Sequence, residues 1–494
     1  MKFCITALAL TTALLPSCME NQEKAAPKPN ILFILLDDLG KEWLNVYGSD
    51  YIETPEIDKL AATGMKFNNA YSMPQCTPSR IALLTGQYPF RNGWINHYDV
   101  PRWGHGGRFD PDKYPGFAKL LQKAGYVTCI AGKWQINDFR LEPNILNEAG
   151  FDEYCMWTGA EGGNEIPSGE RYWNPYIHTK EGSRTYKGQF GEDIFSDFII
   201  DFMKRHKDMP MLMYYPMCLP HTPFTTTPAE PDVPQEYMHH AMVRYTDFIL
   251  GKLVKALDNL NIRNNTIIIW TTDNGTVNSL TGARFNNPVQ GGKTFLTENG
   301  INAPFIVNCP GLVPEGVETD ALVDFTDFLP TFAELAHIKP DTGFIYDGRS
   351  FASLILGKTS ESQRNWALAM GSHPAGIENG RIANSFNYRD RVILDRQYKV
   401  YVDTLGQIYE MVDLKNDFYE VNNLIKEENS DIKNALVKFK SVLSELPSYD
   451  ANPYYEKLEN SIFDIPLDEL LDMSNKGMRR PNKSPVPTEY AKPE

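Results

Sequence analysis

The sequence contains few cysteines, no surplus of positive charge and no long apolar run beyond its N-terminus. Its seven cysteines match neither the spacing of a metal motif nor that of a disulfide framework. The formal net charge of −15 argues against nucleic acid as a partner, because binding to phosphates requires a basic face. After the N-terminal run, no stretch is long and apolar enough to form a membrane helix, and no repeat is present.

Length and composition indicate a globular protein with more than one domain. A chain of 494 residues is too long for one ordinary core, so we expect two domains, one of them large. With 42% hydrophobic and 22% charged residues, the composition is that of a soluble fold.

The first 29 residues have the layout of an export signal followed by a tether. Lys2 precedes an apolar run from Ile5 to Leu15, which is too short to span a membrane. The run ends in Leu-Pro-Ser-Cys and resembles a bacterial lipoprotein signal, with Cys18 as the lipidated first residue. We therefore expect a signal peptide over residues 1–17 and a polar tether over 18–29. The protein would be exported to the periplasm or cell surface and held at the membrane by this lipid. A plain signal peptide cut nearby is the alternative.

The other cysteines have no pattern that assigns them a role. Cys4 would leave with the signal peptide. Of the remainder, Cys129, Cys218 and Cys309 lie in apolar, strand-like contexts, whereas Cys155 does not. We interpret all four as buried small hydrophobic side chains, and a pairing between two of them stays open.

Two short apolar runs end in carboxylate and amide side chains. The run from Asn30 to Leu36 is typical of a buried parallel strand, and Asp37 and Asp38 follow it. A second such run precedes Asp273 and Asn274. Adjacent carboxylates at the end of a buried strand repel each other and need a cation, and open α/β sheets bind ligands at that end. Four oxygen ligands with three negative charges suit Ca²⁺, with Mg²⁺ as the second possibility. Taken alone, the first pair also fits an exposed loop with two acids.

A further cysteine lies beside a predicted helix, in the stretch Cys76-Thr77-Pro78-Ser79-Arg80, with Leu-Thr-Gly shortly after it. We expect the helix to follow this stretch, to run through Leu84 and to be closed by Gly86 and Pro89. Helix N-termini present free N–H groups and the positive end of a dipole, which favours a nucleophile that must receive an anion. Without its context, the stretch is a loop cysteine beside a Pro-Ser turn.

This stretch resembles the maturation signature of the type I sulfatases, C-x-P-S-R followed by L-T-G. In that family, which belongs to the alkaline-phosphatase-like superfamily, a dedicated enzyme oxidises the cysteine to formylglycine. One hydroxyl of the aldehyde hydrate attacks the sulfate ester, and the other then expels sulfate as the aldehyde re-forms. A serine or thiol would instead leave a stable sulfo-enzyme that water cleaves slowly. The resemblance implies that Cys76 is oxidised in this way and that a formylglycine-generating enzyme is a partner.

A second segment carries the resemblance with one departure. Residues 125–135 follow the family's G-Y-x-T-x-x-x-G-K-W-H at every fixed position except the last, where Gln135 replaces histidine. Lys133 would bind sulfate, although a lone lysine is usually solvated. The family's histidine takes a proton during sulfate release, whereas glutamine can hydrogen-bond to sulfate but cannot accept a proton. Either another base acts here, or release is slower, or the chemistry is altered.

A histidine and a second lysine complete the resemblance. Pro220-His221-Thr222-Pro223 is similar to P-H-x-P, whose histidine contacts the substrate and can protonate the leaving oxygen. A lone histidine between prolines is otherwise a structural turn residue. Residues 292–304 resemble G-x-K-x-x-x-x-E-G-G-I-R-x-P, in which Lys293 would bind sulfate. Asn299 and Asn302 depart from the usual Gly and Arg, which is expected to affect loop packing more than chemistry.

The resemblance implies a single assembled site. Its metal ligands would be Asp37, Asp38, Asp273, Asn274 and an oxygen of matured Cys76. The catalytic residues would be Cys76, Arg80, Lys133, His221 and Lys293, and the substrate would contact Lys133, Gln135, His221 and Lys293. By analogy, Asp273 helps to deprotonate the attacking hydroxyl, Arg80 holds the diol and His221 protonates the leaving alcohol. The positive charges of the divalent cation and of the three basic side chains exceed the negative charges of the three aspartates by about +2. This local excess would attract a sulfate ester despite the acidic surface.

The fold implied by the resemblance is an alkaline-phosphatase-like α/β sandwich with a central mixed, mostly parallel sheet. We expect a catalytic domain over residues 30–370, and a smaller C-terminal α+β subdomain with an antiparallel sheet, and a tail, over 371–494. In the latter, residues 391–403 and 407–412 alternate like antiparallel strands around a turn, and a helix is expected over residues 431–446. The Pro-rich tail is expected to be irregular.

The function implied by the resemblance is hydrolysis of a sulfate ester, with a sulfated saccharide as substrate. One alternative is a phosphate or phosphonate monoester hydrolase of the same superfamily, because the metal site suits both tetrahedral anions. The other is a non-catalytic glycan-binding lipoprotein, which Gln135 alone favours. The sugar depends on loops that the sequence does not place, among them Trp94 to Gly107 and the segment around His373 and Arg381.

Overall fold

The computed structural model describes most of the chain after residue 27. The described residues are 28–94, 108–139, 142–159, 170–372, 375–379, 381–384, 386–452, 454, 483 and 485–486. The expected signal peptide, nearly all of the tether, residues 95–107, His373 and most of the Pro-rich tail lie outside them, and only the backbone of Arg381 is described. None of the helices within these ranges has the length and apolar character needed to cross a membrane.

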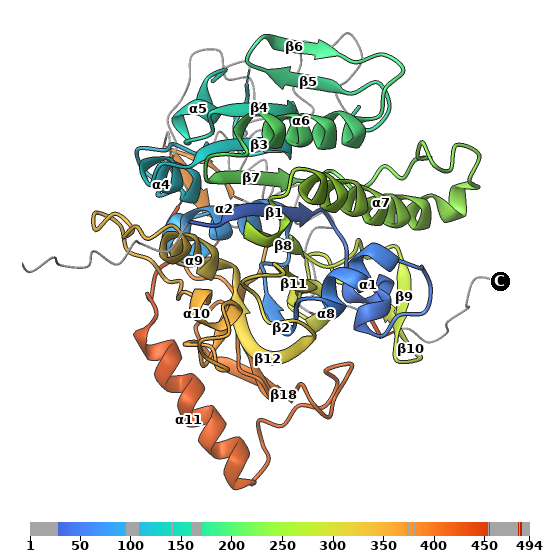
Figure 1. Ribbon diagram of the computed structural model, residues 1–494. Coiled ribbons are helices and arrows are strands. Elements are labelled where there is room, and N and C mark those ends of the chain that lie inside the picture. Colours follow the sequence, from blue (N-terminus) through green and yellow to red (C-terminus); the bar gives the residue numbers. More distant parts are fainter. Residues whose placement is uncertain are drawn as a thin grey trace, which may run out of the picture.

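A ten-stranded sheet runs through the middle of the molecule (Figure 1). Its strands are β1 Asn30–Leu36, β2 Met65–Tyr71, β3 Val127–Lys133, β4 Glu153–Trp157, β5 Tyr176–Thr179, β6 Gly182–Thr185, β7 Met211–Pro216, β8 Thr266–Thr272, β11 Phe305–Asn308 and β12 Val317–Asp324. They follow the order β12-β2-β11-β8-β1-β7-β3-β4-β5-β6. The central strands β8, β1, β7, β3 and β4 pair in parallel, whereas β11, β5 and β6 pair antiparallel with their neighbours. The expected mixed, mostly parallel sheet is therefore confirmed.

Helices cover both faces of this sheet. They are α1 Pro55–Ala62, α2 Cys76–Thr85, α3 Pro89–Asn92, α4 Phe117–Lys123, α5 Ile145–Glu148, α6 Gly191–His206, α7 Met238–Asn259, α8 Glu298–Ile301, α9 Phe328–Leu335 and α10 Ala352–Ile355. Short 3-10 helices are η1 Lys41–Trp43, η2 Asn45–Tyr47, η5 Gln235–Tyr237, η6 Arg263–Asn265 and η7 Phe325–Asp327.

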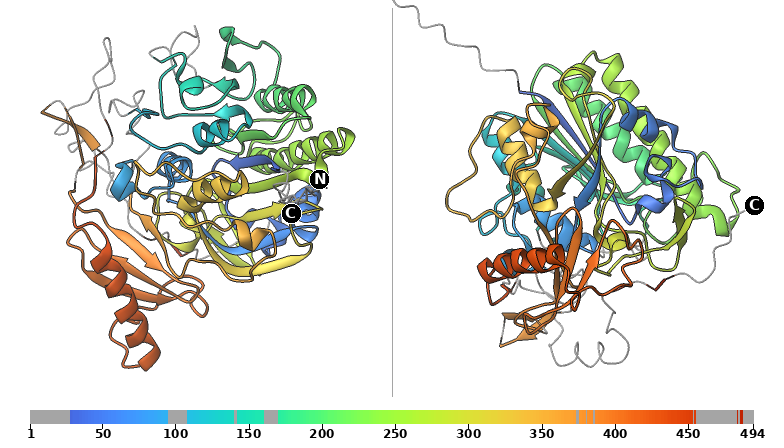
Figure 2. Two further views of the ribbon diagram at one scale, coloured as in Figure 1. Left: turned by 60° about the vertical axis from the view of Figure 1, so that its left-hand side comes forward. Right: turned by 90° about the horizontal axis from the view of Figure 1, so that it is seen from below.

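The apolar residues of β1 belong alternately to two hydrophobic cores. Ile31, Phe33 and Leu35 pack in the core that contains α2, α4, α9 and α10. Leu32, Ile34 and Leu36, which alternate with them along the strand, pack in the core that contains α1, α6 and α7. Successive side chains of a strand point to opposite faces, so a continuously apolar strand must be covered on both sides. The view from below in Figure 2 shows helices on either side of the sheet.

The C-terminal part forms a second, smaller sheet with its own core. Strands β13 Ala367–Met370, β16 Arg391–Leu394, β17 Tyr398–Val402 and β18 Ile408–Asp413 pair antiparallel, and α11 Ser430–Glu445 packs with them. This unit lies below the large sheet (Figure 1). Two separate hairpins are β9 Thr281–Arg284 with β10 Asn287–Gln290, and β14 Ala375–Glu378 with β15 Arg381–Asn384.

Three local predictions were wrong. Helix α2 begins at Cys76 and not after Arg80, because Pro78 lies in the first helical turn, where a missing N–H removes no hydrogen bond. Residues 391–403 form two strands, separated by a turn, where one was expected. Cys155 lies within β4, so it is strand-like as well. All four of the remaining cysteines are buried, as interpreted, and the pairing that was left open is absent, because each of them is free.

Candidate active site

The two acidic pairs lie side by side at the carboxyl edge of the central sheet. Strands β1 and β8 are parallel neighbours paired to their last residues, so the residues that follow them meet. The Asp38 backbone N–H donates to Asp273 Oδ1 at 3.2 Å, and Asn274 Nδ2 donates to Asp38 Oδ1 at 2.7 Å. Both pairs, including Asp37, are buried. The fold thus gathers three carboxylates and one amide within the protein interior.

Helix α2 places Cys76 and Arg80 against these carboxylates. Cys76 is the first helical residue, and Arg80 follows one turn later on the same face. Arg80 Nη2 and Nε donate to Asp273 Oδ2 at 2.7 and 3.0 Å. Cys76 Sγ and a carboxylate oxygen from each of Asp37 and Asp273 lie within 4.8 Å of one another. An oxygen attached to residue 76 would therefore lie beside the two aspartates.

Two lysines approach the aspartates from different elements. Lys133, the last residue of β3, places its Nζ 2.6 Å from Asp37 Oδ2. Lys293, from the loop before α8, places its Nζ 2.6 Å from Asp38 Oδ2. Lys133 is buried and Lys293 is partly exposed. Three basic side chains thus surround three acidic ones.

Burial and opposite charge act against each other on the pKa values of this cluster. Burial favours the neutral form of Asp37, but Lys133 and the other cations hold the pKa of its carboxyl below the usual range. Burial similarly disfavours the charged form of Lys293, yet Asp38 raises the pKa of its ammonium group. Burial and the charge of Asp37 raise the pKa of Asp273 to about 7, although Arg80 opposes this shift. Asp273 is thus the carboxylate of the cluster that protonates most readily.

His221 faces the same cluster with one of its ring nitrogens. Its Nε2 lies 3.1 Å from Lys293 Nζ and 3.5 Å from Asp38 Oδ2. Its Nδ1 lies 2.6 Å from the carbonyl oxygen of Thr222. Burial, and then the charge of Lys293, lower the pKa of the imidazole to about 3. The ring is therefore neutral at pH 7 in this arrangement and accepts a hydrogen bond from Lys293.

The loop that carries His221 is held by side chains that the sequence did not single out. Glu192, in the first turn of α6, accepts the Cys218 backbone N–H at 2.7 Å and also binds the Tyr215 hydroxyl. The Tyr172 hydroxyl lies 2.6 Å from the carbonyl oxygen of Cys218. Neither residue belongs to a recognisable motif, and their role depends only on the way the chain folds. No sequence signal would have found them.

The donor set at the strand ends fits a hard divalent cation. Asp37 Oδ1 and Asn274 Oδ1 are buried and have no hydrogen-bond partner among the described residues. Such oxygens are costly to leave unpaired, and a cation would satisfy both. Carboxylate and amide oxygens are the ligands that Ca²⁺ and Mg²⁺ prefer. The residues present therefore fit the expected metal.

Gln135 lies two residues beyond β3, with a positive φ of 77° and a largely buried side chain. Its Oε1 has no hydrogen-bond partner in the described part of the chain. Among the described residues, no hydrogen bond joins Gln135 to the other predicted site residues. The structure thus brings most of the predicted site residues together by direct contacts: the three aspartates, Asn274, Cys76, Arg80, both lysines and His221. Gln135 follows Lys133 by two residues but makes no such contact within the described ranges.

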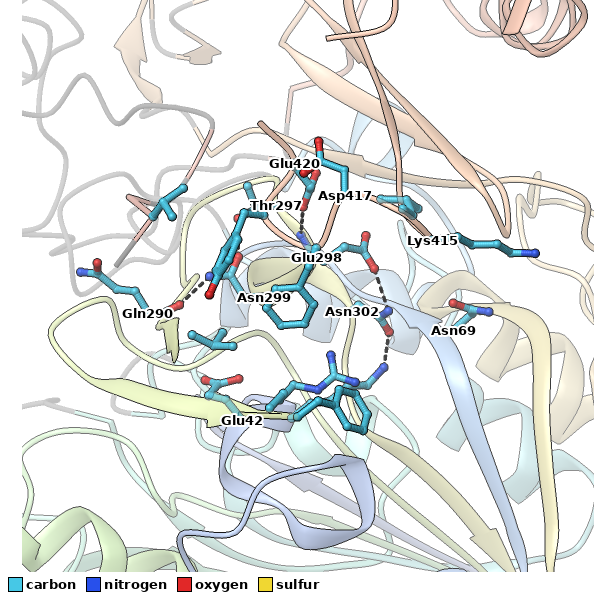
Figure 3. A pocket seen from close by; sticks show the side chains of 18 of the residues that line it. Glu42, Asn69, Gln290, Thr297, Glu298, Asn299, Asn302, Lys415, Asp417 and Glu420 are labelled. Atoms are coloured by element: carbon cyan, nitrogen blue, oxygen red, sulfur yellow. Dashed lines mark hydrogen bonds between the residues drawn. The ribbon is translucent and has the colours of Figure 1, made fainter. Parts of the chain in front are cut away.

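The C-terminal sheet holds the loop that carries Lys293. Lys399 Nζ donates to the carbonyl oxygen of Leu296 at 3.1 Å and lies 2.6 Å from Glu420 Oε2. Glu420 Oε1 accepts the Glu298 backbone N–H at 2.6 Å, which Figure 3 shows as a dashed line. A cavity of about 410 Å³ lies at this junction. The second lysine is therefore positioned in part by residues outside the catalytic sheet.

Two family models and several known proteins match this chain. The family described as Sulfatase matches residues 29–338, and the family described as N-sulphoglucosamine sulphohydrolase, C-terminal, matches residues 291–446. The N-acetylgalactosamine-6-sulfatase of Canis lupus familiaris is 32% identical over 357 residues, which cover 67% of this chain and 67% of that protein.

Two longer matches extend the comparison to the C-terminal part. The ulvan-active sulfatase of Formosa agariphila is 28% identical over 501 residues, with 92% of this chain and 90% of that protein covered. The crystal structure of Ps i-CgsB has a TM-score of 0.72 at 25% identity and covers 92% of this chain and 98% of that one. The Sulfatase match alone spans more than half of the chain. The chain therefore belongs to the sulfatase family, has the alkaline-phosphatase-like fold and is a sulfuric ester hydrolase.

Proposed function

We propose that this sulfatase removes sulfate from a sulfated carbohydrate, with a formylglycine made from Cys76 and a divalent cation in the site. The position of residue 76 carries the proposal: it begins α2 and lies beside Asp37 and Asp273. The carbohydrate class is supported by the names of relatives, an N-acetylgalactosamine-6-sulfatase and an ulvan-active sulfatase. A structure of Ps i-CgsB in complex with k-i-k-neocarrahexaose points the same way.

The sulfate group would lie between the basic side chains and the start of α2. Arg80, Lys133 and Lys293 provide three positive charges at fixed positions in a buried site. The free N–H groups of the first turn of α2 add the positive end of a helix dipole. Preorganised charges of this kind stabilise the negative charge that develops on the sulfate oxygens in the transition state.

The cation would be held by Asp37, Asp38, Asp273, Asn274 and an oxygen on residue 76. When bound, such an ion stabilises charge on oxygen ligands and favours ionisation of a hydroxyl among them. The hydrate of formylglycine supplies one hydroxyl for attack and a second that allows sulfate to leave. Ca²⁺ is proposed in preference to Mg²⁺ because the site offers so many protein oxygens.

Protons would be handled by groups already in contact with these residues. Asp273 lies beside residue 76 and is proposed to accept the proton of the attacking hydroxyl, while Arg80 fixes its carboxylate. His221 Nε2 and Lys293 Nζ share a hydrogen bond and together present a proton towards the leaving oxygen. A sugar alcohol is a poor leaving group, so this protonation is expected to matter most for a carbohydrate ester.

Sulfate release after co-expression with a formylglycine-generating enzyme tests the proposal. The panel contains sulfated mono- and oligosaccharides, an aryl sulfate and a phosphate monoester, and mass spectrometry verifies oxidation of residue 76. Cys76→Ala should abolish release, and Cys309→Ala, at a buried cysteine outside the site, should not. Faster cleavage of the phosphate ester, or no release by matured protein, would contradict the proposal.

We also propose that the protein is exported as a lipoprotein anchored through Cys18. The N-terminal sequence supports this proposal by its apolar run and its Leu-Pro-Ser-Cys ending. Metabolic labelling with a fatty acid should mark the wild-type protein and not Cys18→Ala. Labelling of both proteins, or of neither, would contradict the anchor.

A further inference from the structure

Arg171 contacts the edge of His221 that points away from the aspartates. Its Nη1 lies 3.2 Å from His221 Nδ1, whereas Nε2 of the same ring faces Lys293 and Asp38. The guanidinium carbon lies 4.2 Å from the centroid of the Trp157 ring, so the guanidinium packs against this ring. A guanidinium in contact with an aromatic ring can still use its N–H groups for other contacts.

The contact with His221 does not satisfy Arg171. Lys293 can only donate, so His221 Nε2 must accept, and the ring proton is assigned to Nδ1. That proton is donated to the Thr222 carbonyl oxygen at 2.6 Å. The Nη1 group of Arg171 therefore meets a nitrogen that has no free lone pair.

No other described residue takes up the charge of Arg171. No ion pair within the described ranges includes it, and its Nε is buried without a hydrogen-bond partner. Arg171 is a partly buried cation without an acceptor among the described residues, and a ligand that brings an anion would supply one. The planar fork of a guanidinium suits carboxylate and sulfate oxygens in particular.

The backbone around Arg171 is fixed, as a preformed binding position requires. The Tyr172 carbonyl oxygen accepts the Gly191 backbone N–H at 2.7 Å. A Cβ added to Gly191 would lie 2.1 Å from the Arg171 carbonyl oxygen, so the two segments are in close contact. Little order would have to be gained when a ligand binds.

We propose that Arg171 binds a second anionic group of the substrate, either a uronate carboxylate or a further sulfate. In the proposed function the reacting sulfate would lie at the other edge of His221, beside Lys293, so this second group would belong to another position on the same sugar or to its neighbour. The proposal rests on the proposed function, because it assumes that His221 touches the leaving oxygen. It assigns the enzyme to doubly acidic saccharides and not to singly sulfated neutral ones.

Matched substrates test the proposal directly. We would compare a monosulfated neutral disaccharide, the same disaccharide with a uronate unit, and its disulfated form. Arg171→Gln should lower kcat/KM for one or both of the doubly acidic substrates by roughly 10- to 100-fold, the loss of a charge-assisted hydrogen bond. The neutral monosulfated substrate should change less than roughly threefold, which is within ordinary context effects. The effect should appear mainly in KM, because the second group does not react.

The substrate whose turnover falls identifies the group that Arg171 binds. Loss confined to the uronate substrate identifies a carboxylate, and loss confined to the disulfate identifies a second sulfate. An equal loss for all three substrates would show that Arg171 acts through His221 and would overturn the proposal, as would no change. Arg184→Gln, at an arginine stacked on Tyr186 outside the site, is the matched control, and Arg171→Lys tests whether the fork is needed beyond the charge.

A binding measurement separates this proposal from the proposed function. In the Cys76→Ala background, calorimetry should show tighter binding of a doubly acidic disaccharide than of the neutral monosulfated one. The preference should vanish when Arg171→Gln is added. If turnover fails for every substrate but this preference is present, the reaction assignment is wrong and the Arg171 assignment stands. If turnover succeeds without this binding preference, the reaction assignment stands and the Arg171 assignment is wrong.

Discussion

Replacement of Glu192 by Gln should remove one component of the pH dependence of stability. Burial raises the pKa of the Glu192 carboxyl from 4.5 to about 7, while its hydrogen bonds from Tyr215 and Cys218 oppose this shift only partly. The folded protein therefore keeps a proton that the unfolded chain loses above about pH 4.5. This contribution to stability is fully present below that pH and is lost as the pH rises through about 7.

The size of the effect follows from the shift. One pKa unit corresponds to about 1.4 kcal/mol, so this carboxyl alone should lower the free energy of unfolding by about 3 kcal/mol between pH 5 and pH 8. Gln keeps the shape and can still accept the Cys218 N–H, but it does not titrate. Other titrating groups are common to both proteins and cancel in the comparison.

Urea denaturation at pH 5 and pH 8 provides the measurement. The free energy of unfolding of the wild type should fall by about 3 kcal/mol more than that of Glu192→Gln over this interval. Glu236→Gln, at an exposed position on η5, should behave like the wild type. Equal pH dependence of wild type and Glu192→Gln would refute the reasoning, because the buried carboxyl would then not hold its proton.

Three further predictions concern the metal, the release step and the C-terminal sheet. Treatment with a chelator should abolish sulfate release and lower the melting temperature, and added Ca²⁺ or Mg²⁺ should restore both, since a bound cation stabilises the fold that holds it. An unchanged melting temperature would contradict the metal assignment. Gln135→His should speed turnover if sulfate release limits the rate; an unchanged or lower rate in single-turnover and steady-state assays would mean that another base acts. Lys399→Met leaves Glu420 buried without its cation and should cost about 3–5 kcal/mol in urea denaturation, whereas Lys440→Met on the exposed face of α11 should cost little. A cost near zero for Lys399→Met would show that the buried pair does not hold the junction.

Much of the reacting centre could be predicted because its residues terminate strongly patterned elements. The run from Asn30 to Leu36 is apolar at nearly every position, which requires a doubly covered strand, and acids at its end must then lie at the ligand-binding edge. Lys133 was predictable in the same way, as the last residue of another buried strand. Such residues can be recognised in the sequence because a charged side chain ends a run of apolar ones.

The surroundings of that centre could not be predicted from the sequence. Glu192, Tyr172 and Arg171 act on His221 through contacts between segments that are distant in the chain, and nothing in their neighbourhood differs from an ordinary helix start or loop. The beginning of α2 was missed because proline usually signals a break, although it is tolerated in the first turn of a helix. Contacts of these kinds follow from tertiary packing and not from local pattern.

Because the loop of Lys293 depends on Lys399 and Glu420, the order of synthesis affects the order in which the parts of the site are completed. Translation proceeds from the N-terminus and domains tend to fold as they emerge. The carboxylates of β1 and β8 can therefore assemble with Lys133 while the strands of the C-terminal sheet are still being synthesised. The loop of Lys293 gains its support only when that sheet docks. The last unit to be synthesised thus completes the anion pocket, and a chain that stops short of it would carry Lys293 on a loop without this support.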